Sequence, residues 1–337
     1  MLSCDHDPAP QTRALRYHAT GKFEEVLRLE TIPSVKPGEG EVLARLETAV
    51  VHPSDLGQIA GTYGRLRTLP AVAGREGVGR VVAVGAGVSA LKPGDRVRMP
   101  EDEGVWRDAV VARADALLPV PADIPDDQAA MAFINPPTAW LLLRKFVALN
   151  PGDWVIQNAA NSAVGECVIQ LAHAAGLRTI NLVRSPEKHE ARLKNLGADI
   201  VLPDDKEAVK AVAAHLAGAS PRLALNSVGG MSVATLIRTL GRDGVLVTFG
   251  GMTGDPIRFP TREFIFSNIT CRGFWMDRWA RSASREERDD VFGQIFENLR
   301  RGTLRMEVDS IWPLEKYAEA LARAAAYGRN GKVLLRP

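Results

Sequence analysis

The sequence predicts a two-domain α/β protein, with one mostly β domain and one domain built on a doubly wound parallel sheet. Three observations lead to this prediction: the length of 337 residues, a composition typical of globular proteins, and a change in the pattern of apolar residues after residue 150. At roughly 100–200 residues per domain, the length allows two cores. We place the first domain at residues 1–135 and 276–337, and the second at residues 136–275.

Short β-rich runs separated by turns characterise the first domain. They lie at residues 41–51, 78–88, 95–100 and 105–121. KPG and PSD breaks between them are typical of turns, so mostly antiparallel strands are expected. An amphipathic helix at 314–326 and a strand at 332–337 are assigned to the same domain.

Apolar strands that alternate with helices characterise the second domain. Strands are expected at 153–159, 178–183, 199–203, 222–227, 245–249 and 269–275, and helices at 164–175, 186–196, 206–217 and 232–240. This alternation is typical of βαβ units and therefore of a parallel sheet. A charged helix expected at 284–301 comes after this domain and is assigned, with the rest of the C-terminal tail, to the first domain.

The charges exclude several classes of partner. Lys and Arg number 42 against 40 Asp and Glu, a formal net charge of +2, with the two signs interspersed. Neither nucleic acid nor a membrane is therefore expected as partner. The apolar stretches are shorter than the roughly 20 residues of a membrane span. Residues 1–18 lack the pattern of a secretory signal, so we expect a cytoplasmic protein.

The cysteines do not form a recognisable site. Cys4, Cys167 and Cys271 are far apart and include no CxxC pair. Neither a disulfide framework nor a cysteine zinc site is expected.

A turn of small residues follows the first strand of the second domain. Residues 160–165 read Ala-Asn-Ser-Ala-Val-Gly, so small residues stand where a dinucleotide-binding turn carries GxGxxG. A pyrophosphate at the start of the following helix is the functional interpretation. An ordinary tight βα turn is the alternative, which the repeated βα context disfavours.

The second strand of this domain ends in Val183-Arg184-Ser185. An acidic residue there would bind a free ribose 2′-hydroxyl. A guanidinium with a neighbouring hydroxyl instead suits a 2′-phosphate, so NADPH is predicted over NADH. A solvated arginine at a strand end is the alternative.

The segments VHPSD, GREGVGRVVAVG and LKPGDRV, followed by the dinucleotide-binding pattern, resemble the medium-chain dehydrogenase/reductase superfamily over nearly the whole chain. The resemblance implies a GroES-like catalytic domain and a Rossmann domain. Zinc dehydrogenases of this superfamily carry zinc ligands at the positions of His52 and Arg75. Because arginine does not bind zinc and the four-cysteine lobe is missing, no metal is expected.

Within the superfamily, the chain most resembles the mitochondrial-type trans-2-enoyl thioester reductases. The segments that carry the resemblance are GTYG at 61–64, NPPTA at 135–139, QNAANS at 157–162, LRTINLVR at 177–184, LNSVGG at 225–230, FGGM at 249–252 and RGFW at 272–275. It implies an NADPH-dependent oxidoreductase of fatty acid metabolism that reduces the C2–C3 double bond of enoyl-CoA or enoyl-ACP.

The same resemblance implies the site residues. Tyr63 is the implied proton donor, a role that suits a phenol because its pKa near 10 keeps it protonated at neutral pH. The implied cofactor-binding residues, with Ser185 added from its place beside Arg184, are Asn135, Asn161, Ser162, Ala163, Val164, Arg184, Ser185, Phe249, Gly250, Gly251, Met252, Phe274, Trp275, Met276 and Lys332. The chain departs from the family at Ser185-Pro186, at Phe249 where Tyr is common, and at His52 where Asn is usual.

Two arginines after Tyr63 are not part of the family pattern. Arg65 and Arg67 flank Leu66 and present two guanidiniums near the presumed substrate mouth. They are candidates for contact with the phosphates of coenzyme A or the acidic surface of an acyl carrier protein. A solvated loop is the alternative.

Two other functions stay open from the sequence. A zinc-independent NADPH quinone or alkenal oxidoreductase would share the fold and the cofactor. An NADPH-binding sensor or structural protein with little turnover is an alternative of another class. The superfamily resemblance further implies a homodimer formed through the strand at 269–275.

Overall fold

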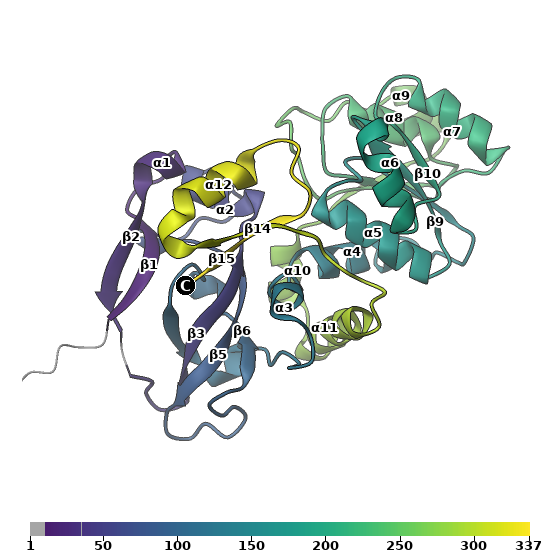
Figure 1. Cartoon of the computed structure of the whole chain (residues 1–337). Coiled ribbons are helices and arrows are strands. Elements are labelled where there is room, and N and C mark those ends of the chain that lie inside the picture. Colours follow the sequence, from purple (N-terminus) through teal and green to yellow (C-terminus); the bar gives the residue numbers. More distant parts are fainter. Residues whose placement is uncertain (1–10, 35) are drawn as a thin grey trace, which may run out of the picture. The chain divides into compact units, whose positions relative to one another are not determined.

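The computed structural model describes residues 11–34 and 36–337 (Figure 1). Residues 1–10 lie outside the described residues. They include Cys4 and part of segment 1–18, on which the prediction of location depends. The chain divides into two compact units, Met1–Phe133 with Met306–Pro337, and Ile134–Arg305. Residues 276–305, which the sequence analysis assigned to the first domain, cluster with the second unit because α11 (Arg285–Arg300) packs on α4 (Asn135–Arg144) and Trp279 shares an apolar cluster with Leu141.

The main sheet of the first unit has six strands. They are β14 (Val308–Pro313), β15 (Lys332–Arg336), β3 (Glu41–Val50), β5 (Glu76–Val84) and β6 (Arg96–Arg98) in that order, with β7 (Ala109–Arg113) also paired to β3. The last strand of the chain, β15, pairs antiparallel with β3. This pairing brings the end of the chain beside a strand near its start.

A second sheet in this unit was not expected from the sequence. It contains β1 (Gln11–Tyr17), β2 (Leu27–Pro33) and the short β4 (Ala71–Val72), with α1 (Phe23–Val26) between the first two strands. Charged residues conceal its alternation. Arg16 of β1 and Glu30 of β2, for example, form an ion pair of 2.9 Å across the hairpin, so residues that read as solvated are cross-strand partners.

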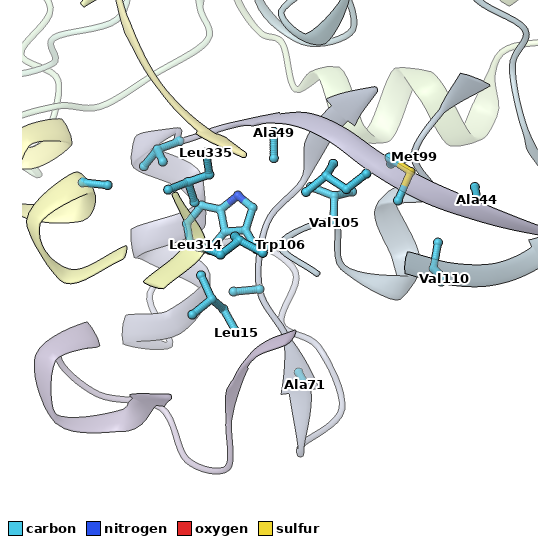
Figure 2. Packing of buried hydrophobic residues seen from close by; sticks show 14 of the residues in the cluster. Leu15, Ala44, Ala49, Ala71, Met99, Val105, Trp106, Val110, Leu314 and Leu335 are labelled. Atoms are coloured by element: carbon cyan, nitrogen blue, oxygen red, sulfur yellow. The ribbon is translucent and has the colours of Figure 1, made fainter. Parts of the chain in front are cut away.

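Trp106 lies at the centre of the first core. Its side chain is fully buried, and its indole Nε1 donates to the carbonyl oxygen of Val50 at 3.2 Å. Figure 2 shows Leu15, Leu314 and Leu335 packed around the ring. Gly74 has a φ of +89°, and a Cβ there would lie 2.3 Å from the Trp106 ring, so this position requires glycine. The core thereby determines the path of the chain just before residue 75.

Shorter helices complete the first unit. They are α2 (Pro53–Ala60), α3 (Asp126–Ala130), α12 (Tyr317–Ala325) and the single-turn 3₁₀ helices at Glu101–Glu103, Ala114–Ala116 and Leu314–Lys316. Of these, α2 and the turn at Glu101–Glu103 position the residues discussed below.

The second unit contains a six-stranded, fully parallel sheet. Its strands, in spatial order, are β10 (Ile200–Pro203), β9 (Arg178–Val183), β8 (Trp154–Gln157), β11 (Leu223–Asn226), β12 (Val245–Thr248) and β13 (Thr270–Gly273). Taken in chain order this is the arrangement 3-2-1-4-5-6 of the Rossmann fold. The predicted fold class is confirmed.

Helices connect these strands. They are α5 (Ala163–Ala174), α6 (Pro186–Asn195), α7 (Ala208–Leu216), α8 (Ser232–Thr239) and α9 (Thr261–Phe266), and α10 (Met276–Ser282) follows the sheet. The helices α4, α9 and α10 were not expected, whereas the other helices of the unit lie where the sequence predicts them. Within the described part of the chain, no helix combines the length and the apolarity that a membrane span requires.

Candidate active site

The turn between β8 and α5 has the geometry of a phosphate-binding turn. Ser162 is the N-cap of α5, and its hydroxyl accepts a hydrogen bond from the backbone N–H of Gly165 at 3.2 Å. A Cβ at residue 165 would lie 2.5 Å from the carbonyl oxygen of Ala160. Glycine at this position therefore lets the helix begin directly on the turn, with its unpaired N–H groups available to an anion.

The sites predicted to bind a cofactor collect at the carboxyl ends of parallel strands. Asn161 to Val164 follow β8, Arg184 and Ser185 follow β9, Phe249 to Met252 follow β12, and Phe274 to Met276 follow β13. Asn135 is the first residue of α4 in the same unit. Ligands of open α/β sheets bind at this edge, so the topology brings together the predicted cofactor residues that follow β8, β9, β12 and β13, whereas the strand order does not place Asn135 or Lys332 there.

A buried network of amides at this edge was missed by the sequence analysis. The Asn158 side chain donates to Asn226 Oδ1 at 2.8 Å and to the Ser232 hydroxyl at 2.9 Å. Ser232 donates to Asp204 Oδ2 at 2.6 Å, and burial raises the pKa of the Asp204 carboxyl. The sequence indicated this network only through polar residues at or just after the ends of the strands, which could equally have been exposed to solvent. The network ties together the ends of β8, β10 and β11.

Two buried polar atoms of this unit, one of them just after β11, indicate a place for a polar ligand. Asn135 Nδ2 and the Ser227 hydroxyl are buried without a hydrogen-bond partner among the described residues. Buried polar groups are nearly always paired, so such atoms point to a missing partner. Gly251 has open space where a Cβ would stand, and Arg184 is exposed beyond β9. These residues fit a dinucleotide with an extra phosphate.

Tyr63 lies in the first unit, in the loop that follows α2. Its backbone N–H donates to the carbonyl oxygen of Gly57 at 3.2 Å, and its half-buried ring contacts Arg75. The Arg75 guanidinium carbon is 4.8 Å from the centre of the ring, and Nη1 donates to the phenol oxygen at 2.6 Å. The hydroxyl predicted to donate a proton is therefore held by a cation.

Arg75 is in turn held by Glu101. Its Nε donates to Glu101 Oε1 at 2.7 Å, and its Nη2 contacts the same oxygen. Arg98 donates to the other carboxylate oxygen of Glu101 at 2.9 Å. Burial lowers the pKa of Arg75, but the charge and hydrogen bond of Glu101 together with Tyr63 and Asp55 more than offset this effect, so the pKa of the guanidinium is raised.

His52 lies at the centre of a second buried network in this unit. Its Nε2 is 2.5 Å from Glu76 Oε2, and its Nδ1 is 3.0 Å from Lys332 Nζ. Because an ammonium group only donates, Nδ1 accepts from Lys332 and Nε2–H donates to Glu76. Glu76 also accepts from the backbone N–H of Phe133 at 2.6 Å. Lys332 is thus part of this network in the first unit, whereas the other predicted cofactor residues belong to the second unit.

Burial changes the protonation of His52 and Asp55 in opposite ways. Burial and the charge of Lys332 lower the pKa of His52 to about 4, so its imidazole is neutral at pH 7. Burial raises the pKa of Asp55 to about 7. Asp55 Oδ2 accepts from the backbone N–H of His52 at 2.7 Å, whereas Oδ1 has no partner among the described residues.

The positions of zinc ligands in zinc dehydrogenases have another use here. Both ring nitrogens of His52 are hydrogen-bonded, and Arg75 is bonded to Tyr63 and Glu101. Among the described residues, no group of three His, Cys, Asp or Glu side chains is arranged to hold a metal ion. The donors at these positions do not fit zinc.

The two arginines that follow Tyr63 differ in their surroundings. Arg65 is exposed and forms an ion pair of 2.9 Å with Asp102. Arg67 is half-buried, and its guanidinium donates to the carbonyl oxygens of Asp102, Gly74 and Glu101 at 2.7, 2.9 and 2.6 Å. These bonds give Arg67 a structural role and do not favour the predicted contact with substrate phosphates.

Two family models match the chain. The alcohol dehydrogenase GroES-like domain matches residues 38–122, and the zinc-binding dehydrogenase model matches residues 163–290. The first match lies in the first unit and the second lies in the Rossmann unit.

Curated proteins and solved structures are similar over almost the whole chain. Mitochondrial enoyl-[acyl-carrier-protein] reductase of Xenopus tropicalis is 40% identical, over 92% of this chain and 91% of the relative. The human protein of the same name is 41% identical, over 95% of this chain and 87% of the relative.

Two solved structures are informative. The Etr1p complex with NADP and crotonyl-CoA has a TM-score of 0.90 at 27% identity, covering 97% of this chain and 100% of the other. A putative NADPH:quinone reductase of Bacillus thuringiensis has a TM-score of 0.89 at 29% identity, covering 98% of this chain and 100% of the other.

Proposed function

Because the chain belongs to the medium-chain dehydrogenase/reductase superfamily, among its enoyl thioester reductases, we propose that it reduces the C2–C3 double bond of trans-2-enoyl thioesters with NADPH. The observation that carries this proposal is 40% identity to an enoyl-[acyl-carrier-protein] reductase over 92% of the chain. The similar Etr1p structure, titled as a complex with NADP and crotonyl-CoA, supports the cofactor and the substrate class.

Tyr63 is the proposed proton donor to the α-carbon of the substrate. When bound, the nicotinamide cofactor supplies the hydride for the β-carbon. The phenol of Tyr63 has a guanidinium beside its oxygen, and a tyrosine hydroxyl is one of the groups that act as general acids in enzymes. Positioned proton donors of this kind typically contribute a factor of about 10²–10⁴ to the rate.

The second unit is the proposed cofactor-binding unit. The α5 N-terminus and Ser162 suit the pyrophosphate, and Arg184 with Ser185 suits the 2′-phosphate. Asn135, Ser227 and the backbone at Gly250 and Gly251 suit the remaining polar groups. For Lys332, cofactor binding stays a prediction from the resemblance, and its ammonium group contacts His52 in the first unit.

The carrier of the acyl chain is the finer part of the proposal. The exposed Arg65 is the proposed contact with a phosphate of coenzyme A or with an acidic carrier protein, since its partner Asp102 is itself exposed and readily exchanged. Arg67, whose donors are bonded to three backbone oxygens and to the Gln58 side chain, is the proposed support of this loop.

Association into a homodimer is also proposed. The strand β13 is at the edge of the parallel sheet, and the helix before it exposes Phe264, Ile265 and Phe266. An uncovered edge strand beside exposed apolar residues suits pairing with a second copy of the chain. The expected cytoplasmic location stays a prediction, and the relatives named above are mitochondrial enzymes. Fractionation of the native host cells is the test of location.

A second candidate is an NADPH quinone reductase, favoured by the similar Bacillus thuringiensis structure of that title. Oxidation of NADPH by the purified protein should be followed with crotonyl-CoA, a longer trans-2-enoyl-CoA, 1,4-quinones and simple enones, using wild type and Tyr63→Phe. We expect thioester turnover that falls sharply in the variant.

Other results would contradict the proposal. Turnover of quinones that does not depend on Tyr63, with inert thioesters, would assign the chain to the quinone reductases. Tight NADPH binding without oxidation on any of these substrates would favour a sensor or structural role.

A further inference from the structure

A buried arginine is directed at the hydroxyl group proposed to supply the proton. Arg75 is only 4% exposed, yet its Nη1 lies 2.6 Å from the phenol oxygen of Tyr63. The guanidinium also lies over the ring, with its carbon 4.8 Å from the centroid. Burying a charge beside a neutral phenol is unfavourable unless its other partners offset the lost hydration.

The direction of this hydrogen bond matters for the chemistry. A guanidinium has N–H donors and no acceptor, so the phenol oxygen of Tyr63 accepts in this contact. The proton of the phenol is therefore not used in the bond to Arg75.

Two side chains fix the position of Arg75: Glu101 binds its guanidinium, and Arg67 holds the backbone nearby. Glu101 binds the Arg75 Nε at 2.7 Å and contacts its Nη2. Arg67 donates to the backbone oxygens of Gly74, the residue before Arg75, and of Glu101, at 2.9 and 2.6 Å. The Arg67 side chain thus joins the backbone of Gly74 to that of Glu101. Because Glu101 also binds the Arg75 guanidinium, this guanidinium has little freedom to move.

We propose that Arg75 is a positioning residue for the protonation step, holding the Tyr63 oxygen and stabilising its negative charge as the proton leaves. In that step the O–H bond of Tyr63 breaks and a C–H bond forms at the substrate α-carbon. The electron pair stays on the phenolate oxygen, which solvent later protonates again. A charge-assisted hydrogen bond that is already formed lowers the barrier without further reorganisation.

This role rests on the proposed function, and a double-mutant cycle separates the two. The variants are Tyr63→Phe, Arg75→Met, Arg75→Lys and Tyr63→Phe combined with Arg75→Met, with Arg80→Met as control. Arg80 lies on the same strand, β5, but pairs with Glu47 and is 42% exposed. For each protein, kcat and KM are measured with NADPH and crotonyl-CoA, and folding is checked by thermal unfolding.

The expected loss in kcat for Arg75→Met is about 10–100-fold, with little change in KM, because a donor to developing charge acts on the transition state. Arg75→Lys should recover part of the activity, and Arg80→Met should match the wild type. In the Tyr63→Phe background the oxygen that Arg75 contacts is absent. There, Arg75→Met should change kcat by less than about twofold if the two residues act as a unit.

The same loss in both backgrounds would overturn the proposal, because it would reflect general damage to the loop. A wild type that does not reduce enoyl thioesters would instead overturn the proposed function. If Arg75→Met does not fold, Glu101→Gln replaces it, since this change loosens the guanidinium and keeps the shape of its partner. Its loss in kcat should also disappear when Tyr63 is Phe, and a loss that persists there contradicts the proposal.

Discussion

The imidazole Nε2 of His52 and the carboxylate Oε2 of Glu76 are 2.5 Å apart, and both side chains are almost completely buried. Lys332 holds the other ring nitrogen at 3.0 Å, so the ring is fixed in one tautomer between a cation and an anion. This arrangement joins the start of α2 to β5 and to the last strand of the chain.

Removal of the imidazole should destabilise the protein. His52→Ala leaves the buried Glu76 carboxylate and Lys332 without these partners, so we expect a loss of about 3 kcal/mol in the free energy of unfolding. His52→Asn retains an amide that can both donate and accept, so its loss should be smaller. Urea unfolding at pH 7.5 measures both values, and equal stability of His52→Ala and wild type would contradict this reading of the network.

Asp55 provides a prediction of pH dependence with a definite sign. Its pKa is raised from 3.8 to about 7 in the folded protein, so the folded state binds a proton more tightly than the unfolded state. Its contribution is therefore fully present at low pH and is lost as pH rises from about 4 through 7. Asp55→Asn keeps an acceptor for the backbone N–H of His52 but does not titrate.

The measurement for Asp55 is the difference in unfolding free energy between wild type and Asp55→Asn from pH 4.5 to 8. We expect the wild type to lose stability relative to the variant as pH rises, by up to about 1.4 kcal/mol per pH unit. His52 titrates in both proteins, and its lowered pKa removes stability as pH falls from 6.5 towards 4, so the difference isolates Asp55. A difference that does not depend on pH would contradict the prediction.

Cofactor preference should depend on Arg184. Loss of a charge-assisted contact with the 2′-phosphate removes about 1.5–3 kcal/mol, so Arg184→Ala should raise KM for NADPH about 10–100-fold and leave KM for NADH unchanged. Arg178→Ala is the matched control, because Arg178 begins the same strand and pairs with Asp199. Equal effects on both cofactors would indicate damage to the fold of β9 and not a lost phosphate contact.

A carrier contact should depend on Arg65. Arg65→Ala is expected to raise KM severalfold for an enoyl-CoA but not for a short enone without phosphates. Arg113→Ala, which removes another exposed arginine of the first unit with an acidic partner, is the control. A similar loss on both substrates would show that the loop, and not a phosphate contact, is affected.

The proposed dimer should depend on the apolar residues before β13. Ile265→Lys combined with Phe266→Glu places two charges on side chains that are 61% and 66% exposed, so the folded subunit should tolerate them. We expect light scattering to give a dimer for wild type and a monomer for the variant at micromolar concentration. A wild type that is monomeric throughout this range would contradict the proposed association.

The second unit could be predicted in large part because its signals are local. Strands such as Val245–Thr248 are short, mostly apolar runs, and the helices α5 and α11 begin after a capping serine, Ser162 or Ser284. The hairpin of β1 and β2 was missed because its charged residues pair across strands and so look like surface residues. The helices α9 and α10 were missed because they are only six and seven residues long.

The candidate site divides in the same way. The turn before α5 and the residues at the strand ends follow from position along the chain, since parallel strands place their carboxyl ends at one edge. The role of Arg67 could not be predicted, because its partners are backbone oxygens of residues 74, 101 and 102 and the side chain of Gln58. In the sequence, nothing distinguishes Arg67 from its exposed neighbour Arg65.

By itself, the sequence determined the Rossmann sheet and the phosphate-binding turn, because spacing and residue type are properties of neighbouring residues. Tyr63 became the candidate proton donor through the resemblance of its segment GTYG to the enoyl thioester reductases. Only the tertiary structure decided what surrounds that phenol. Arg75 reaches it through a glycine turn against Trp106, and Lys332 reaches His52 across 280 residues of chain. Contacts of this range depend on how strands pair and cores pack, and these are not encoded in any local pattern.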